Sequence, residues 1–250
     1  MTPPAGPIGL LEGLATTRAI RRYTDQPVTD EELAAILHSA TRAPTGSNRQ
    51  PFRFMVLRDG PVAAEAKRLI GVAAQTMWSE KRVADGYDRG SGTLRDSPKA
   101  RMERTMQHYV DNFGRVPVLV LPCLVRYREP SVFEGSSIYP ACQNLLLAAR
   151  AIGLGGVLTG FHHTVESELN ALLGVPENAI IHATITLGHP KGRHGPVRRR
   201  PLSELVFENG WGLSPSWAID PLGTAFTSNG PPRSAEPTDH NSPAERLVGD

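Results

Sequence analysis

Two short stretches of the chain carry side chains suited to holding an anionic or polar ligand. The first, TTRAIRRY (16–23), places three arginines, Arg18, Arg21 and Arg22, within five positions near a chain start that is otherwise almost uncharged. The planar guanidinium group presents several N–H donors in a fixed arrangement that matches phosphate oxygens. These arginines are therefore candidate phosphate ligands. A solvated cationic surface is the alternative, and this stretch alone leaves it open.

The second stretch, RAPTGSNRQPF (42–52), joins a predicted helix to a predicted strand. The helix is expected from about Asp30 to Arg42, because Thr29 and Glu32 form a capping-box pattern ahead of apolar residues at helical spacing. The prolines and the glycine of the stretch cannot continue a helix, and alternating residues from Phe52 onward are typical of a strand. The loop between them holds polar side chains that can face a ligand, namely Ser47, Asn48 and Gln50.

The remaining elements predict one hydrophobic core without regular alternation of strands and helices. Helices are expected over 62–74, 138–152 and 165–173, and buried strands over 116–125 and 179–190. This order favours an α+β fold over a doubly wound sheet. We expect one domain over 10–212, with an insertion over the core at 75–114, where the helical pattern breaks down. Residues 213–250 are predicted to be a C-terminal extension that is disordered in its last part.

Composition excludes several classes of protein. The 250 residues carry 27 basic and 25 acidic side chains, so the formal net charge of +2 indicates neither a nucleic-acid partner nor a membrane surface. Basic residues at 197–200 lack the interleaved aromatics of a nucleic-acid site. The two cysteines show no metal-ligand spacing, so no metal is predicted. The first 17 residues lack the pattern of a signal peptide, and we expect a cytoplasmic location.

The sequence from Thr16 to Phe54 as a whole resembles the opening of the nitroreductase family of FMN-dependent oxidoreductases. In that family an Arg-rich turn, D-x-P-V, a capped helix and A-P-S/T-x-x-N-x-Q-P-W/F follow in this order. Two later stretches, 139–161 and 187–206, resemble the family's central helix with its flavin-contacting turn and its closing basic segment. The resemblance implies a central mixed or antiparallel sheet flanked by helices, and a homodimer with FMN at the subunit interface.

The resemblance also implies a role for individual residues. Arg18 and Arg21 match basic residues that hold the FMN phosphate and the ribityl and pyrimidine side. Ala19 stands where the family often has Ser, which removes one hydroxyl donor to the phosphate. Arg199, with Arg200 beside it, matches a late basic position that reaches the phosphate. The implied cofactor contacts are Arg18, Ala19, Arg21, Arg22, Ser47, Asn48, Gln50, Leu158, Thr159, Gly160, Arg199 and Arg200.

No side chain is expected to be the catalyst, because a flavin carries the chemistry itself. By resemblance, NADPH or NADH reduces the flavin, and an electron-poor acceptor such as a nitroaromatic or a quinone then uses the same site. Other flavin-dependent reactions remain open, including reduction of activated double bonds, dehalogenation and destruction of flavin. So does a non-catalytic flavin-binding or storage protein. The insertion at 75–114 is predicted to act as a lid whose positive charges attract the extra phosphate of NADPH.

Overall fold

The computed structural model describes residues 8–227 and divides the chain into two compact units at Pro196 and Val197. The expected disordered tail falls mainly on residues 228–250, which lie outside the described residues.

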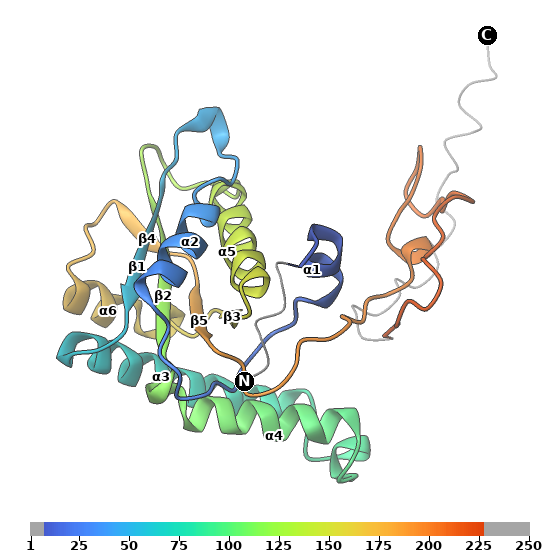
Figure 1. Cartoon of the computed structure of the whole chain (residues 1–250), viewed down its shortest axis with the longest axis horizontal. Coiled ribbons are helices and arrows are strands. Elements are labelled where there is room, and N and C mark those ends of the chain that lie inside the picture. The colour runs from blue at the N-terminus through green and yellow to red at the C-terminus, as the bar shows by residue number, and fades with distance from the viewer. Residues whose placement is uncertain (1–7, 228–250) are drawn as a thin grey trace. The chain divides into compact units, whose positions relative to one another are not determined.

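The first unit contains all the regular helices and strands of the described chain (Figure 1). Its α-helices are α1 (Leu10–Thr16), α2 (Asp30–Ala40), α3 (Pro61–Ala84), α4 (Pro98–Asp111), α5 (Tyr139–Ala151) and α6 (Glu166–Leu173). Its strands are β1 (Phe52–Leu57), β2 (Val118–Val125), β3 (Gly155–Thr159), β4 (Ala179–Ile181) and β5 (Thr184–Gly188). All the strand pairs are antiparallel, in the order β1-β2-β5-β3, with β4 paired to β2. The expected α+β fold is confirmed.

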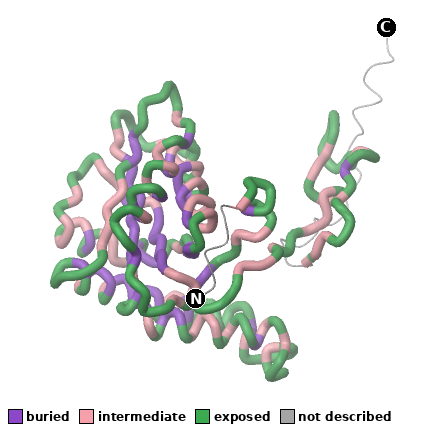
Figure 2. Tube along the Cα trace, in the orientation of Figure 1, coloured by how far each residue is buried: buried purple, intermediate pink, exposed green. Residues whose placement is uncertain are grey.

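The sheet separates two hydrophobic cores, because β2 is buried on both faces. Val118, Val120 and Leu124 pack with α2 and α5. The alternate residues Leu119, Leu121 and Cys123 pack with α3, α4 and α6. Figure 2 shows this burial as a continuous run along the central strands. A strand covered by helices on both sides reads as an unbroken apolar run, which is the pattern at 116–125.

Local signals placed α2 and β1 correctly. The backbone N–H of Glu32 donates to Thr29 Oγ1 at 3.2 Å, and the backbone N–H of Thr29 donates to the Glu32 carboxylate at 2.8 Å, which completes the predicted capping box. The helix ends at Ala40, two residues before the expected end, because Arg42 and Ala43 turn back to bond the carbonyls of Ser39 and Ala40.

The region 75–114, expected as an insertion in which the helical pattern breaks down, is mostly helical. Helix α3 continues to Ala84 instead of ending at Ala74, and α4 occupies most of the rest. Trp78, Tyr109 and Phe113 are buried in the second core, and the Trp78 indole N–H donates to Gln107 at 3.0 Å. These aromatic contacts join α3 to α4, and no local periodicity could reveal them. The hairpin tip, residues 85–97, and the last three residues, 112–114, lie outside the two helices.

Other boundaries also differ from expectation. The expected strand over 179–190 is two strands, and β2 bonds β4 through Cys123–Val125 but β5 through Val118–Val120. Pro122 lies between these two pairing segments, where its missing N–H is tolerated. Helix α6 begins at Glu166 after a 3-10 turn, one residue later than expected. Within residues 8–227, no helix combines the length and apolar character needed to cross a membrane.

Candidate functional site

Residues 18–22, the arginine turn, lie along the outer side of β3. The Ile20 N–H donates to the Gly156 carbonyl at 2.9 Å. A Cβ at Gly155 would lie 2.5 Å from Ile20 Cγ1, and one at Gly156 would lie 2.6 Å from the Thr186 carbonyl oxygen. Real side chains cannot approach so closely, so Gly155 allows the turn to pack against β3, and Gly156 allows β3 to pack against β5.

A buried hydroxyl network fixes the far side of the turn. The Tyr23 hydroxyl lies 2.8 Å from the Ile20 carbonyl oxygen and 2.7 Å from Thr186 Oγ1. The Tyr109 hydroxyl of α4 lies 2.9 Å from the same Thr186 Oγ1. Burial raises the pKa of both tyrosines, so both phenols stay neutral and available as donors. The turn is thereby tied to β5 and to α4.

Arg18 and Arg21 leave their guanidinium groups without protein partners. Within residues 8–227, neither side chain forms a hydrogen bond or an ion pair. Arg18 is exposed, whereas Arg21 is partly buried and its Nε atom is shielded from solvent without an acceptor. Burial lowers the pKa of Arg21, with the nearby Tyr109 the largest opposing influence. A buried cationic donor without an acceptor is costly, so the pair fits an anionic ligand such as a phosphate ester.

The other predicted residues of this region behave differently. Arg22 is exposed and contributes its carbonyl, which accepts from the Lys191 N–H at 2.9 Å. Ala19 is exposed and offers only its backbone. Both lie in the turn, and neither side chain contributes a donor that is held in place by the fold.

Leu158, Thr159 and Gly160 continue the strand along which the turn lies. Leu158 remains 38% exposed although it lies within β3, so it presents an apolar surface at the sheet edge. Thr159 Oγ1 donates to the Thr184 carbonyl at 3.3 Å. The following His162 is buried, with Nε2 at 2.9 Å from the Ile181 carbonyl and Nδ1 at 3.2 Å from Thr184 Oγ1. The strand end is therefore rigid, and the structure brings it together with the arginine turn through β3.

The loop after α2 has a constrained backbone. Ser47, Asn48 and Gln50 have φ values of 51°, 51° and 50°, and they are three of the four non-glycine residues with positive φ in residues 8–227. Such conformations persist where the surrounding structure imposes them, and they concentrate at binding loops. Here Thr45 Oγ1 accepts from the Gln50 N–H at 3.0 Å, and the Gln50 side-chain amide donates to Asn48 Oδ1 at 3.2 Å. This last bond leaves the Asn48 amide N–H groups free to donate outward.

This loop does not meet the arginine turn within one chain. The Gly46 N–H lies 3.5 Å from Ser137 Oγ, just before the N-terminus of α5, and Arg49 stacks over Tyr127 at 4.8 Å. At the other end of α5, the Arg150 guanidinium lies 3.3 Å from Thr16 Oγ1, next to the arginine turn. The 13 residues of α5 separate the two groups by about 20 Å.

The predicted late arginines belong to the second unit. Arg200 donates to Glu204 at 2.8 Å through Nε, so its charge is partly neutralised locally. Arg199 is exposed and its backbone pairs with Phe226. Among the described residues of this unit, its side chain donates only to the neighbouring Arg198 carbonyl. Within this unit Arg199 is the freer of the two guanidinium groups.

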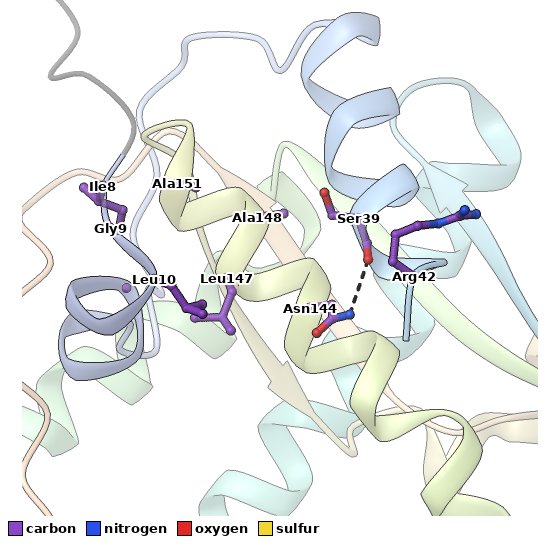
Figure 3. A pocket seen from close by; sticks show the side chains of 10 residues that line it. Ile8, Gly9, Leu10, Ser39, Arg42, Asn144, Leu147, Ala148 and Ala151 are labelled. Atoms are coloured by element: carbon purple, nitrogen blue, oxygen red, sulfur yellow. Dashed lines mark hydrogen bonds between the residues drawn. The ribbon is translucent and has the colours of Figure 1, made fainter. Parts of the chain in front are cut away.

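A surface pocket of about 380 Å³ lies between α1, α2 and α5 and contains none of the predicted site residues (Figure 3). Ser39, Arg42 and Asn144 form its polar end, where Asn144 donates to the Ser39 carbonyl at 3.4 Å. The rest of its lining is mainly apolar and comes from Ile8, Gly9, Leu10, Gly13, Leu147, Ala148 and Ala151. We therefore treat it as a surface for packing and not as the site of chemistry.

Sequence reasoning missed Tyr23, Tyr109 and His194, which surround the arginine turn. His194 donates from Nε2 to the Leu154 carbonyl at 3.0 Å, and a Cβ at the adjacent Gly195 would lie 4.0 Å from Arg18 Nη1. Tyr23 is the last residue of the motif TTRAIRRY, and an aromatic residue directly after the arginines could have indicated its role. No local signal marked Tyr109 or His194, because both reach the turn only through the fold.

Comparison with known proteins places this geometry in context. An NADH dehydrogenase from Thermus thermophilus is 29% identical over 208 residues, covering 76% of this chain and 90% of the relative. An NADPH-flavin oxidoreductase from Vibrio harveyi is 26% identical over 201 residues, covering 80% and 73%. The solved structure of nitroreductase A from Vibrio parahaemolyticus shares the fold, with a TM-score of 0.58, 24% identity, and coverage of 80% and 76%. A model of the nitroreductase family matches residues 14–189, and this chain therefore belongs to that family.

Proposed function

We propose that this protein binds FMN and uses NADPH or NADH to reduce an electron-poor small molecule such as a nitroaromatic or a quinone. The observation that carries the proposal is the partly buried Arg21 guanidinium, which has no partner within residues 8–227 and lies beside the free Arg18. An anionic cofactor supplies the missing acceptors. The names of relatives agree with this choice, since they include an NADPH-flavin oxidoreductase and an FMN reductase.

Each residue of the turn has a distinct task in this proposal. Arg18 holds the phosphate, and Arg21 faces the pyrimidine side of the ring. Leu158, Thr159 and Gly160 form the rigid edge on which the ring lies. Bound FMN supplies the redox chemistry, taking a hydride from the nicotinamide and passing electrons to the acceptor. No side chain of the chain itself then needs to form a covalent bond with substrate.

Arg21 also tunes the cofactor. Its positive charge is held in a partly dry site by the turn, and Tyr23 and Tyr109 fix the surrounding elements. A preorganised cation stabilises negative charge without further reorganisation. With FMN bound, Arg21 would stabilise negative charge on the pyrimidine side of the ring and so favour reduction.

The site is completed by a second copy of the chain. The loop bearing Ser47, Asn48 and Gln50 lies about 20 Å from the arginine turn along α5, so we assign it to the flavin of the partner subunit. An apolar surface for such a homodimer is available on the first unit. It consists of the exposed Leu10, Leu11 and Leu14 of α1 and the neighbouring pocket beside α5.

Spectroscopy tests the cofactor and the reaction directly. The purified protein is expected to be yellow, with the absorbance of bound FMN, and NADH or NADPH is expected to bleach it under anaerobic conditions. Added nitroaromatic or quinone should then restore the colour at a rate set by the acceptor. Yellow protein that resists bleaching by both nicotinamides would instead indicate flavin storage. Colourless protein that does not bind added FMN would refute the proposal.

Mixed subunits test the shared site. Arg18→Ala removes the turn's phosphate ligand and Asn48→Ala removes the loop's donor, so each variant alone should bind FMN weakly. Mixing them after dissociation and reassembly should restore roughly a quarter of the sites, because one site of each mixed dimer then carries neither substitution. Sites built within single chains would show no recovery. Sedimentation of a monomer that keeps its FMN would exclude the shared site altogether.

We also propose that the hairpin tip, residues 85–97, controls access of the nicotinamide. Several of the basic side chains near the tip hold its structure: Lys99 donates to the Asp85 carbonyl at 2.8 Å, and Arg104 donates to the Arg95 carbonyl at 2.7 Å. The Arg89 and Arg95 side chains form no hydrogen bond within residues 8–227. These two are therefore the candidates to contact the extra phosphate of NADPH.

A further inference from the structure

Three hydroxyl groups form a chain of contacts that ends on the arginine turn. The Tyr109 hydroxyl lies 2.9 Å from Thr186 Oγ1, and the Tyr23 hydroxyl lies 2.7 Å from the same atom. The Tyr23 hydroxyl also lies 2.8 Å from the Ile20 carbonyl oxygen and 3.1 Å from the Thr186 carbonyl oxygen. Each hydroxyl carries one hydrogen, so three hydrogens serve this chain.

The contact with the Ile20 carbonyl sets the direction of the chain. A carbonyl oxygen can only accept, so the single Tyr23 hydrogen points to Ile20. The Thr186 hydroxyl then donates to the Tyr23 oxygen, and the Tyr109 hydroxyl donates to Thr186 Oγ1. The opposite order would leave the Ile20 carbonyl without its donor. Burial raises the pKa of both tyrosines, so both phenols keep their hydrogens near pH 7.

The carbonyl at the end of the chain belongs to the peptide unit that leads into Arg21. The Ile20 N–H donates to the Gly156 carbonyl at 2.9 Å, so both backbone polar groups of Ile20 are bonded. A peptide unit is planar, and its carbonyl and the following Cα therefore move together. Tyr23 has little room to shift, because a Cβ at Gly188 would already lie 2.8 Å from Tyr23 Cδ1. The Tyr23 hydroxyl thus fixes the backbone from which the Arg21 side chain starts.

The Arg21 side chain has no contact of its own that would hold it in place. Its guanidinium forms no hydrogen bond or ion pair within residues 8–227, and its Nε atom is shielded from solvent. An unpaired charged group has a lower free energy in water, so it would turn outward if the backbone allowed this. The restraint on Arg21 must therefore come from the backbone, and the Tyr23 hydroxyl supplies it from within the turn.

We propose that Tyr23 is a positioning residue, whose hydroxyl clamps the Ile20–Arg21 peptide unit and keeps the Arg21 guanidinium directed at the pyrimidine side of the flavin. The inference rests on the proposed function and adds to it the group that holds Arg21. The Tyr23 hydroxyl is occupied by Ile20 and Thr186, so it acts through Arg21 and not on the flavin itself.

Two substitutions each remove one hydroxyl from this chain and keep the aromatic ring. Tyr23→Phe removes the donor to the Ile20 carbonyl. Tyr109→Phe is the matched control, because it leaves the bonds from Thr186 to Tyr23 and from Tyr23 to Ile20 in place. Each variant is also combined with Arg21→Met. Affinities for FMN and riboflavin are measured by fluorescence titration of flavin-free protein, and the midpoint potential of bound FMN by spectroelectrochemical titration.

Tyr23→Phe should weaken FMN and riboflavin to the same degree, about three- to tenfold, because Arg21 faces the ring and not the phosphate. It should also lower the midpoint potential of bound FMN, since a loosened cation stabilises the reduced ring less. Tyr109→Phe should change both quantities less. In protein that already carries Arg21→Met, Tyr23→Phe should change neither quantity further, because the residue through which it acts is gone.

Thermal unfolding of the flavin-free protein tests the clamp without any cofactor. Arg21→Met removes a guanidinium that is confined without an acceptor, so it should raise the unfolding temperature. After Tyr23→Phe the turn is free to release the guanidinium to water, and the same substitution should then raise the unfolding temperature less. After Tyr109→Phe the increase should stay as large as in the wild type.

Three results would overturn the inference. Equal effects of Tyr23→Phe on affinity and potential with and without Arg21 would mean that Tyr23 only holds the fold. Equal effects of Tyr109→Phe and Tyr23→Phe would assign the role to the network as a whole, and unchanged affinity and potential after Tyr23→Phe would exclude the clamp. The proposed function would fail differently, through wild-type protein that binds no flavin, and the unfolding comparison would still decide whether Tyr23 restrains Arg21.

Discussion

Replacing Arg21 by methionine should make the flavin-free protein more stable while it weakens the cofactor. In the flavin-free state the guanidinium is partly buried, its Nε is shielded from solvent, and no acceptor within residues 8–227 contacts it. A buried donor without a partner costs about 1–3 kcal/mol, and a methionine of similar length fills the space without that cost. We therefore expect Arg21→Met to raise the free energy of unfolding by about 1 kcal/mol. For a chain of this size the unfolding temperature should rise by about 2–4 °C.

With FMN bound the effect should reverse. Loss of a hydrogen bond to a charged donor costs about 1.5–3 kcal/mol, so the FMN dissociation constant should increase about ten- to a hundredfold. The midpoint potential of any bound FMN should fall, because the cation that favours the reduced form is gone. The assays are thermal unfolding of flavin-free protein, fluorescence titration with FMN and a spectroelectrochemical titration.

Arg22→Met is the matched control, since Arg22 is the adjacent arginine and is exposed. It should change neither the stability of the flavin-free protein nor the potential. If Arg21→Met destabilised the flavin-free protein and left FMN affinity unchanged, Arg21 would be a structural residue. An unchanged or higher potential would remove its proposed effect on the flavin.

Three further predictions concern the phosphate, acid stability and the nicotinamide. Arg18→Ala should weaken FMN about ten- to a hundredfold and leave riboflavin binding unchanged. The family resemblance assigns a phosphate contact to Arg199 as well, so Arg199→Ala should have the same effect, whereas Arg200→Ala, which loses an ion pair to Glu204, should act mainly on stability. The reverse order at 199 and 200 would shift the phosphate contact by one residue. Burial lowers the pKa of His162, so the unfolded chain binds a proton at this histidine more readily than the folded chain does. The free energy of unfolding should therefore fall as pH drops below roughly 6.5. In urea unfolding His162→Gln should make this free energy depend less on pH, and an unchanged pH dependence would contradict the argument. Arg89→Ala and Arg95→Ala should each lower the ratio of kcat/KM for NADPH to kcat/KM for NADH. Lys81→Ala is the control, because the Lys81 charge is paired with Asp85. If both the Arg89 and the Arg95 variants keep the wild-type ratio, the hairpin tip does not bind the extra phosphate of NADPH.

Elements with local signals could be read from the chain alone. The capping box of Thr29 and Glu32 fixed the start of α2, because its hydrogen bonds join residues three positions apart. Helix α6 ends at Leu173, the expected last residue, because Gly174 follows at φ 64°, a conformation that a residue without a Cβ adopts readily. The ordered motifs from Thr16 to Phe54 were sufficient to indicate the family, and the family model confirms it.

Long-range packing decided what these signals could not. The continuation of α3 to Ala84 depends on the contact between Trp78 and α4. Helix α4 follows only after the hairpin tip, so no pattern of neighbouring residues could indicate this contact. For the same reason the region at 75–114 looked like an insertion although its side chains fill a core.

The sequence by itself determined which residue types are available for a flavin site: arginines in a turn, amides in a proline- and glycine-bearing loop, and a strand end with Gly160. The tertiary structure decided which of them can act on one ligand. Arg21 is partly buried beside Tyr109, which α4 brings from a distant part of the chain, and no acceptor within residues 8–227 contacts its Nε. The length of α5 sets the distance between the arginine turn and Asn48. A rigid helix holds its two ends apart whatever the sequences at those ends.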